Sequence, residues 1–185
     1  AMLLYEDGRI QHDGVVLGDG GDPPVAGHLY HGASGEDLGY FGHLRLPRNV
    51  SAVTAACLAV RREVFEAVGG FDEVNLAVAF NDVDFCLRIG AAGYDIVWTP
   101  HAKLFHLESA SRGPDTRPEA ARRFAQEVAY MRRRWGSVLD NDPFYGPIFD
   151  RDFGDYRLAF PPHRDRPWTL ARPVEPRAIV GMDSM

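Results

Sequence analysis

The sequence predicts an α/β domain in which a mixed sheet is flanked by helices. Residues 2–17 hold two strand-like runs around an Asp-Gly turn, and from residue 50 onward strand-like and helix-like segments alternate. With 185 residues, of which 45% are hydrophobic and 25% charged, the chain is long enough to form one domain with a sizeable core.

The first strands are predicted at residues 2–5 and 10–17. Asp7-Gly8 between them supplies the tight reversal that joins antiparallel neighbours, so we expect a β-hairpin. Residues 18–49 then contain eight glycines with interspersed histidine and tyrosine, a stretch longer than compact domains usually keep without a role. This segment is either a binding loop or partner surface, or an insertion of no consequence.

The middle of the chain is predicted to contain one buried strand and two short helices. The apolar run at residues 50–60 suits a buried strand, and residues 61–71 suit a helix that ends at Gly69-Gly70. A second helix follows over residues 81–91, where apolar residues recur at helical spacing and Asn81 fits the N-cap position.

The last third begins with two strand-like segments, residues 94–100 and 102–109. Pro118 then opens a long helix, residues 118–135, with an apolar stripe on one side. Its other side is a solvated face or a contact with an anionic membrane surface, and it carries Arg122, Arg123, Arg132, Arg133 and Arg134. Residues 141–185 are expected to form an irregular, proline-rich tail.

Two acidic residues stand at the start of the helix that Asn81 opens. Asp84 and Arg88 are one turn apart, the spacing at which a carboxylate and a cation pair on a helix surface. Asp82 has no obvious partner, and its simplest interpretation is an acid stabilised by the positive end of the helix dipole. Local spacing therefore explains Asp84 and leaves Asp82 open.

Charge and composition argue against several classes of protein. A formal net charge of −6 argues against broad nucleic-acid binding. Cys57 and Cys86 lie in apolar segments without CxxC spacing, so buried reduced thiols are expected rather than a zinc site or a disulfide framework. No apolar run is long enough to span a membrane and no signal peptide opens the chain. We therefore expect a cytoplasmic protein, with the inner membrane as a peripheral contact.

Several short motifs follow one another in a specific order along the chain. TAAC at residues 54–57 precedes NDVD at 81–84, which precedes HLES at 106–109, and GGFDE and AGYDIVWTP lie between them. This series resembles the second half of glycosyltransferase family 2 enzymes of the GT-A fold. The resemblance extends to rhamnosyltransferase-like members that act in bacterial surface polysaccharide synthesis, and it covers most of residues 2–160.

The resemblance implies a chemical role for Asp82. In that family an acidic pair, usually Glu-Asp, heads the corresponding helix, and its second residue is the catalytic base of an inverting transfer. Here the pair is Asn81-Asp82, so the first position departs from the pattern and the second keeps the carboxylate. A carboxylate suits this role because the acceptor hydroxyl must lose its proton as its oxygen attacks the anomeric carbon. Thr54, Asp84 and Arg88 are then expected to bind the acceptor, and Asp84 keeps its structural alternative as the partner of Arg88.

The resemblance also assigns residues to the donor side. His106 matches a family histidine near the donor diphosphate, where it completes the coordination of a divalent metal, Mn or Mg. Arg112 follows this histidine, and its guanidinium suits a leaving diphosphate. The structural alternatives are a histidine that caps a strand end and an exposed loop arginine. The remaining histidines of the first 50 residues show no ligand spacing and are interpreted as polar loop residues: His12, His28, His31 and His43.

The resemblance predicts that the fold is the C-terminal portion of a GT-A nucleotide-diphospho-sugar transferase, with residues 1–140 as its acceptor side. Family members also carry an N-terminal nucleotide-binding half with an Asp-X-Asp metal motif, and this chain contains neither. We therefore expect a fragment of a larger enzyme, inactive by itself and a homodimer through the surface that the other half would cover. The parent enzyme's substrates would be a nucleotide-sugar donor and a glycan or lipid-linked acceptor.

Two other functions fit parts of the sequence. A non-catalytic module could bind carbohydrate or a protein partner through residues 18–49. A metal-dependent hydrolase that uses Asp82, Asp84 and His106 is disfavoured, because no second cluster of carboxylates and histidines completes a ligand set.

Overall fold

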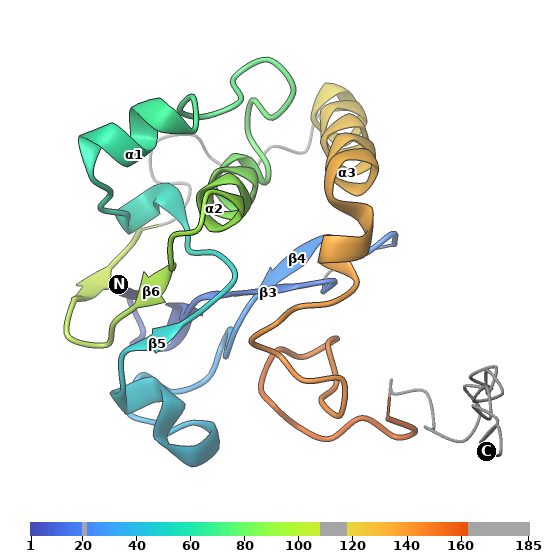
Figure 1. Ribbon diagram of the computed structural model, residues 1–185. Coiled ribbons are helices and arrows are strands. Elements are labelled where there is room, and N and C mark those ends of the chain that lie inside the picture. The colour runs from blue at the N-terminus through green and yellow to red at the C-terminus, as the bar shows by residue number, and fades with distance from the viewer. Residues whose placement is uncertain (20–21, 108–117, 163–185) are drawn as a thin grey trace, which may run out of the picture.

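The computed structural model describes residues 1–19, 22–107 and 118–162, and it shows a mixed α/β arrangement (Figure 1). Three helices lie together on one side of short strands, and residues 141–162 lie on the other side. No helix in the described ranges is both long and apolar enough to cross a membrane. The predicted α/β class with a mixed sheet is confirmed.

The N-terminal hairpin forms as predicted and belongs to a three-stranded mixed sheet. Strand β1 (Met2–Leu4) pairs antiparallel with β2 (Ile10–His12) and parallel with β7 (Lys103–Phe105), giving the order β2–β1–β7. The second predicted strand is broken at Gly14, whose φ of +98° favours glycine. Beyond it, β3 (Val15–Leu17) pairs with β4 (Ala26–His28) in a separate two-stranded sheet.

The strand predicted at residues 50–60 is wrong. A two-residue strand, β5 (Arg48–Asn49), comes just before it and pairs with β6 (Val97–Trp98). Within the apolar run Ala52 makes a single bridge to Val15, and the chain then turns into the 3-10 helix η2 (Ala55–Cys57). The apolar residues mark burial, and the Thr54 hydroxyl, which accepts a hydrogen bond from the Ala56 amide at 3.3 Å, favours a turn instead of a ladder.

The three predicted helices are confirmed as α1 (Arg62–Ala67), α2 (Asn81–Ala91) and α3 (Pro118–Leu139). The N-cap assignment of Asn81 is wrong, because Asn81 is the first helical residue and Phe80 holds the cap position with a φ of +60°. The Phe80 ring packs against Phe124 of α3, with ring centroids 5.6 Å apart. This contact supports a backbone conformation that costs free energy in a non-glycine residue.

The main core cluster spans the strands and the helices, and a smaller second cluster contains Phe85. The largest fully buried side chains include Trp98, Phe85 and Tyr145. Tyr145 lies beyond residue 140, where the sequence predicts a tail, and packs with Phe149 and Tyr156 into the main core cluster. Asp142 fastens this segment to the body by accepting hydrogen bonds from the Leu17 amide at 2.7 Å and the Ser51 hydroxyl at 2.8 Å. The domain boundary at residue 140 stays a prediction.

Asp84 is the centre of a buried polar network between α2 and α3. Its side chain is fully buried and accepts hydrogen bonds from Arg88 Nε and from Trp135 Nε1, each at 2.8 Å. Arg134 approaches the same carboxylate at 3.3 Å. Arg88 continues the network by donating to the main-chain oxygens of Val68 and, at 2.6 Å, Gly70. The Asp84–Arg88 pair predicted from spacing is confirmed, and it is buried rather than on the surface.

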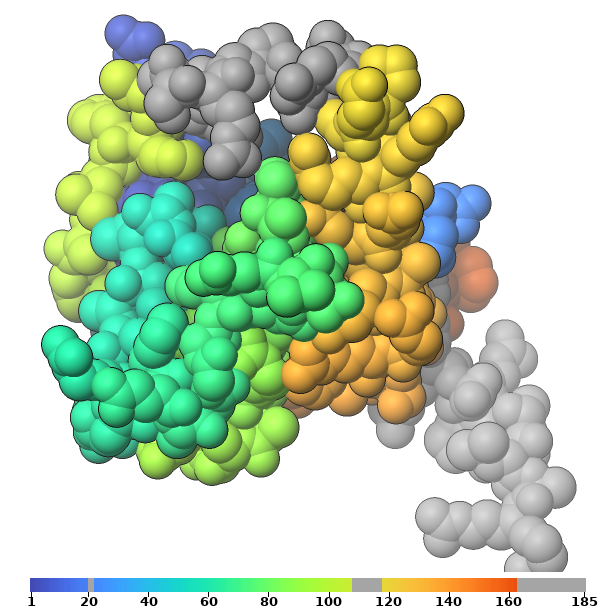
Figure 2. Space-filling model, turned by 90° about the horizontal axis from the view of Figure 1, so that it is seen from above, coloured from blue at the N-terminus to red at the C-terminus, as the bar shows by residue number. Residues whose placement is uncertain are grey.

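The segment between α1 and α2 is held by α3. Glu127, 2% exposed, accepts hydrogen bonds from the amides of Val78 at 2.9 Å and Ala79 at 3.2 Å. Asp72 accepts a hydrogen bond from the Tyr130 hydroxyl at 2.6 Å, and this bond is the main reason why its pKa is lowered to about 2. Figure 2 shows this segment, in green, lying across the molecule between the η2–α1 region and α3. The approach to α2 is therefore positioned by two side chains of α3.

Asp84→Asn should lower the free energy of unfolding by about 3 kcal/mol, because it leaves Arg88 without its buried counter-charge. Chemical denaturation followed by circular dichroism measures the change. Asp95→Asn, at an exposed position, is the matched control and should change stability by less than about 0.5 kcal/mol. Equal stabilities of the two variants would contradict the central role of the Asp84 network.

Candidate functional site

Asp82 lies in the first turn of α2 and its carboxylate is half-buried. Oδ2 accepts a hydrogen bond from the Ala55 amide at 3.0 Å, and Oδ1 lies 2.9 Å from the amide of Val83. The sequence shows no partner for Asp82 because its partners are main-chain amides, which any residue except proline provides. This carboxylate is thereby fixed against the 54–57 turn.

Thr54 connects Asp82 with a second group of polar residues. Its amide donates a hydrogen bond to His12 Nε2 at 3.3 Å, while the next amide along the chain, that of Ala55, donates to Asp82. Two consecutive main-chain amides thus bind the side chains of His12 and Asp82, which are 70 residues apart in the sequence. The structure therefore brings together Thr54 and Asp82, both predicted site residues.

A cavity of about 130 Å³ lies beside Thr54, and four histidines contribute to its wall. We call it the histidine cavity, and its lining residues are Leu3, Tyr5, Gln11, His12, His28, His31, Thr54 and His106. The interpretation of His12 and His28 as loop residues is wrong, because they lie in β2 and β4. Sequence spacing could not group these histidines, since strand pairing and the turn after β4 bring them together.

His12 is a buried neutral histidine whose tautomer the structure defines. Its Nε2 accepts from the amides of Gly14 and Thr54, both at 3.3 Å, so Nε2 carries no hydrogen. Its Nδ1 therefore donates to Nδ1 of His28, 2.8 Å away. Burial is the main cause that lowers the pKa of His12 well below its usual value, and the neighbouring His28 adds to it.

His106 directly follows β7 and is half-buried. Its amide donates to the Leu4 carbonyl at 2.9 Å, and its ring Nδ1 lies 2.7 Å from Oε1 of Gln11. His106 thus joins Thr54 at the histidine cavity. Arg112, the other predicted donor-side residue, lies outside the described residues.

Asp84 and Arg88, predicted to bind the acceptor, do not line the histidine cavity. Asp84 is fully buried and Arg88 is 14% exposed, and both are engaged in the network between α2 and α3. This position suits the structural alternative for Asp84. Acceptor binding by the pair stays a prediction.

A metal site needs several donor side chains close together. No group of three or more His, Cys, Asp or Glu side chains in those ranges could hold a metal ion. His106, the predicted ligand, carries a ring nitrogen of the kind that binds divalent cations. The described residues therefore do not complete a metal site, and ligation of a cation by His106 stays a prediction.

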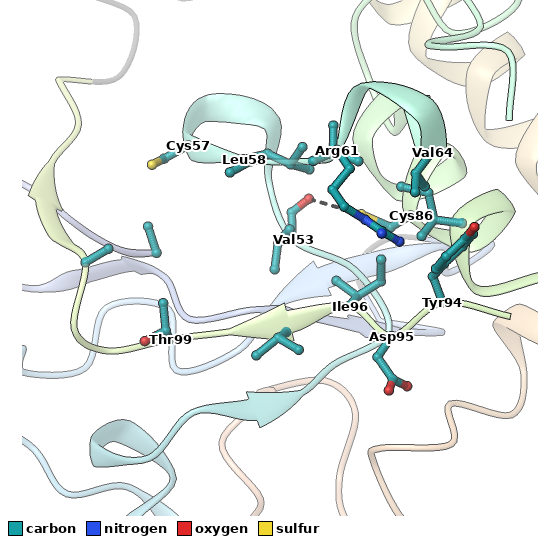
Figure 3. Close-up of a pocket in the computed structure, with 16 residues that line it drawn as sticks. Val53, Cys57, Leu58, Arg61, Val64, Cys86, Tyr94, Asp95, Ile96 and Thr99 are labelled. Carbon is teal, nitrogen blue, oxygen red and sulfur yellow. Dashed lines mark hydrogen bonds between the residues drawn. The ribbon is translucent and has the colours of Figure 1, made fainter. Parts of the chain in front are cut away.

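A larger apolar cavity of about 410 Å³ lies beside the 54–57 turn (Figure 3). Val53, Leu58 and Ile96 contribute its apolar wall, and Arg61 stacks over the Tyr94 ring at 5.5 Å. Both cysteines are free and border this cavity, with Cys86 buried and Cys57 half-buried. Burial raises the pKa of Cys86 to about 12, so this thiol stays protonated at neutral pH and is not a nucleophile.

The chain is similar to bacterial proteins that are much longer. It is 53% identical over 161 residues to an uncharacterized protein y4gI of Sinorhizobium fredii, covering 87% of this chain and 17% of that protein. It is 42% identical over 146 residues to the O-antigen biosynthesis protein RfbC of Myxococcus xanthus, covering 78% of this chain and 11% of RfbC. The chain therefore spans less than a fifth of the length of these two curated relatives.

A shorter match concerns an enzyme. Over 68 residues, 37% of this chain and 22% of the relative, the chain is 41% identical to an N-acetylglucosaminyl-diphospho-decaprenol L-rhamnosyltransferase of Mycobacterium tuberculosis. No family model matches the chain. No solved structure gives a significant match either.

The buried His12 makes stability depend on pH. Below about pH 6.5 the unfolded chain protonates this histidine and the folded chain does not, so its contribution is present above that pH and is lost as pH falls. Each pH unit below that point should remove up to about 1.4 kcal/mol. Urea denaturation of wild type and His12→Gln between about pH 8 and pH 5 measures the difference in slope.

The slope of wild type must be compared with that of His12→Gln because other titrating groups change stability with pH in the opposite direction to His12. Burial raises the pKa of Asp13 to about 7. This residue therefore adds folding stability as the pH falls from about 7 toward the pKa of a free carboxyl group. His101→Gln, at an exposed histidine, is the control and should keep the wild-type slope. Parallel pH profiles for wild type and His12→Gln would show that His12 is not held neutral.

Proposed function

We propose that this chain is part of a glycosyltransferase of the family 2, GT-A type that acts in the synthesis of bacterial surface polysaccharide. The named roles of RfbC and of the rhamnosyltransferase support this proposal. The observation that carries it is the hydrogen bond between the Ala55 amide and Asp82, 3.0 Å long. It joins the two motifs, TAAC and NDVD, to which the family resemblance gives acceptor binding and catalysis.

Asp82 is the base in the proposed reaction. The acceptor hydroxyl oxygen forms a bond to the anomeric carbon, the bond from that carbon to the nucleotide diphosphate breaks, and Asp82 takes the hydroxyl proton. A single displacement of this kind inverts the anomeric centre. The half-buried carboxylate suits the role because two main-chain amides fix it while part of it remains accessible.

A divalent cation, Mn or Mg, belongs to the proposal. His106 would supply one ligand, and residues outside the described ranges and the diphosphate of the donor would supply the others. The cation would stabilise charge on the departing diphosphate. The donor would be a nucleotide sugar and the acceptor a glycan or a lipid-linked sugar.

A second candidate is a non-catalytic module that binds carbohydrate or protein through residues 18–49. This segment packs on the core through Leu44 and Tyr30, yet it leaves Phe41 85% exposed and Leu38 63% exposed. Such apolar exposure suits a partner surface. Homodimer formation through exposed apolar residues, which also include Leu104 and Phe105 of β7, stays a proposal.

Asp82→Asn in the full-length enzyme should reduce sugar transfer by roughly 10²–10⁴-fold, the usual contribution of a positioned proton acceptor. The amide keeps the size of the carboxylate and its oxygen still accepts from the Ala55 amide, at the cost of the bond from the Val83 amide, so folding and donor binding should be largely retained. Transfer from a radiolabelled nucleotide sugar measures the rate, and calorimetry measures donor binding.

Asp95→Asn is the control for this experiment, because Asp95 is an exposed carboxylate close to the end of the same helix. It should keep wild-type transfer. Near-normal turnover by Asp82→Asn would remove Asp82 from the chemistry. A full-length protein that binds carbohydrate and transfers none, in wild type and variant alike, would favour the non-catalytic module.

The basic face of α3 gives a separate prediction about membranes. Arg132 pairs with Asp140 at 2.8 Å and Arg134 lies 3.4 Å from Asp72, whereas Arg122 and Arg133 are both exposed. Replacing both by alanine should weaken pelleting with anionic liposomes roughly 30-fold, at about 1 kcal/mol per residue. Pelleting that does not depend on anionic lipid would contradict a role for this face.

A further inference from the structure

Gln11 is a buried polar residue on β2, and its place in the core needs an explanation. It is 6% exposed, and a buried amide lowers stability unless it is hydrogen-bonded. Both ends of its amide meet the same residue, His106. Oε1 lies 2.7 Å from the ring Nδ1, and Nε2 lies 3.5 Å from the main-chain oxygen. Because the strand order is β2–β1–β7, Gln11 reaches across β1 to make these contacts.

The two contacts are satisfied together by one assignment of hydrogens. A main-chain carbonyl oxygen only accepts hydrogen bonds, so the amide atom that faces it is the nitrogen of Gln11. The oxygen of Gln11 then faces the ring and also only accepts, so Nδ1 of His106 must carry the hydrogen. In the neutral ring Nε2 keeps its lone pair, and no residue in the described ranges hydrogen-bonds to it.

We propose that Gln11 is a positioning residue that holds His106 as the Nδ1–H tautomer, so that Nε2 is the atom presented to a ligand at the histidine cavity. His106 and Gln11 both line this cavity. A partner on one ring nitrogen commonly fixes which nitrogen binds a cation or accepts a hydrogen bond. The tautomer follows from the contacts alone, and the identity of the ligand as a divalent cation rests on the proposed function.

Long-range ¹H–¹⁵N correlation NMR tests the tautomer, because protonated and unprotonated ring nitrogens resonate at different frequencies. At about pH 8.5, roughly two units above the ordinary histidine pKa, His106 of the wild-type chain should carry its hydrogen on Nδ1. Gln11→Leu should convert it mainly to the Nε2–H form. Gln11→Glu should keep the Nδ1–H form, because a carboxylate still accepts at Nδ1.

Gln126→Leu, on the exposed face of α3, is the matched control and should leave the His106 spectrum unchanged. A wild-type His106 with its hydrogen on Nε2 would overturn the proposal without any variant. Retention of the Nδ1–H form in a folded Gln11→Leu chain would overturn it too. A Gln11 that only supports the core would lower stability in the variants without moving the tautomer.

Sugar transfer by the full-length protein separates this proposal from the proposed function. Transfer reduced at least 10-fold in Gln11→Leu and regained in Gln11→Glu would support the positioning role in the working enzyme. If the NMR result is as expected and wild type transfers no sugar, the proposed function fails and the role of Gln11 toward His106 stands. Failure of the proposal for Gln11 is therefore seen in the NMR spectrum, and failure of the proposed function is seen in the transfer assay.

Discussion

The carboxylate of Asp84 is the interaction on which the helical half of the molecule depends. It joins α2 to α3 through Trp135 and reaches the glycine turn after α1 through Arg88. A buried carboxylate is tolerated only when hydrogen bonds and cations surround it, and here three donors do so. Because α2 is fixed in this way, its first turn has a defined position, and that turn carries Asp82.

Asp82, at the candidate site, lies in this first turn of α2 and is held in place by a different set of contacts. Glu127 of α3 holds the residues that lead into α2, and the 54–57 turn holds Asp82 itself. The histidine cavity is assembled by strand pairing instead, since β2 and β7 lie on either side of β1. Two independent structural units therefore meet at Thr54, one helical and one made of strands.

The sequence predicts much of this fold and less of the site. Helical spacing gives α1, α2 and α3, and the Asp-Gly turn gives the first hairpin, because these signals are local. The apolar run after residue 50 misleads, since burial does not require a strand and Thr54 turns the chain. Asp82 could be singled out only by family resemblance, because its partners are main-chain amides. The group of His12, His28 and His106 could not be predicted, because it depends on pairing between distant strands.

The bond from the Ala55 amide to Asp82 also bears on how such a site can change during evolution. A contact made by the peptide group is independent of the side chain at position 55, so that side chain can change while the carboxylate keeps this hydrogen bond. Only proline, which has no amide hydrogen, is excluded there. In the proposed glycosyltransferase, acceptor selectivity and reactivity would thereby be separated within two adjacent peptide units, and related chains could exchange acceptors without rebuilding the carboxylate of Asp82.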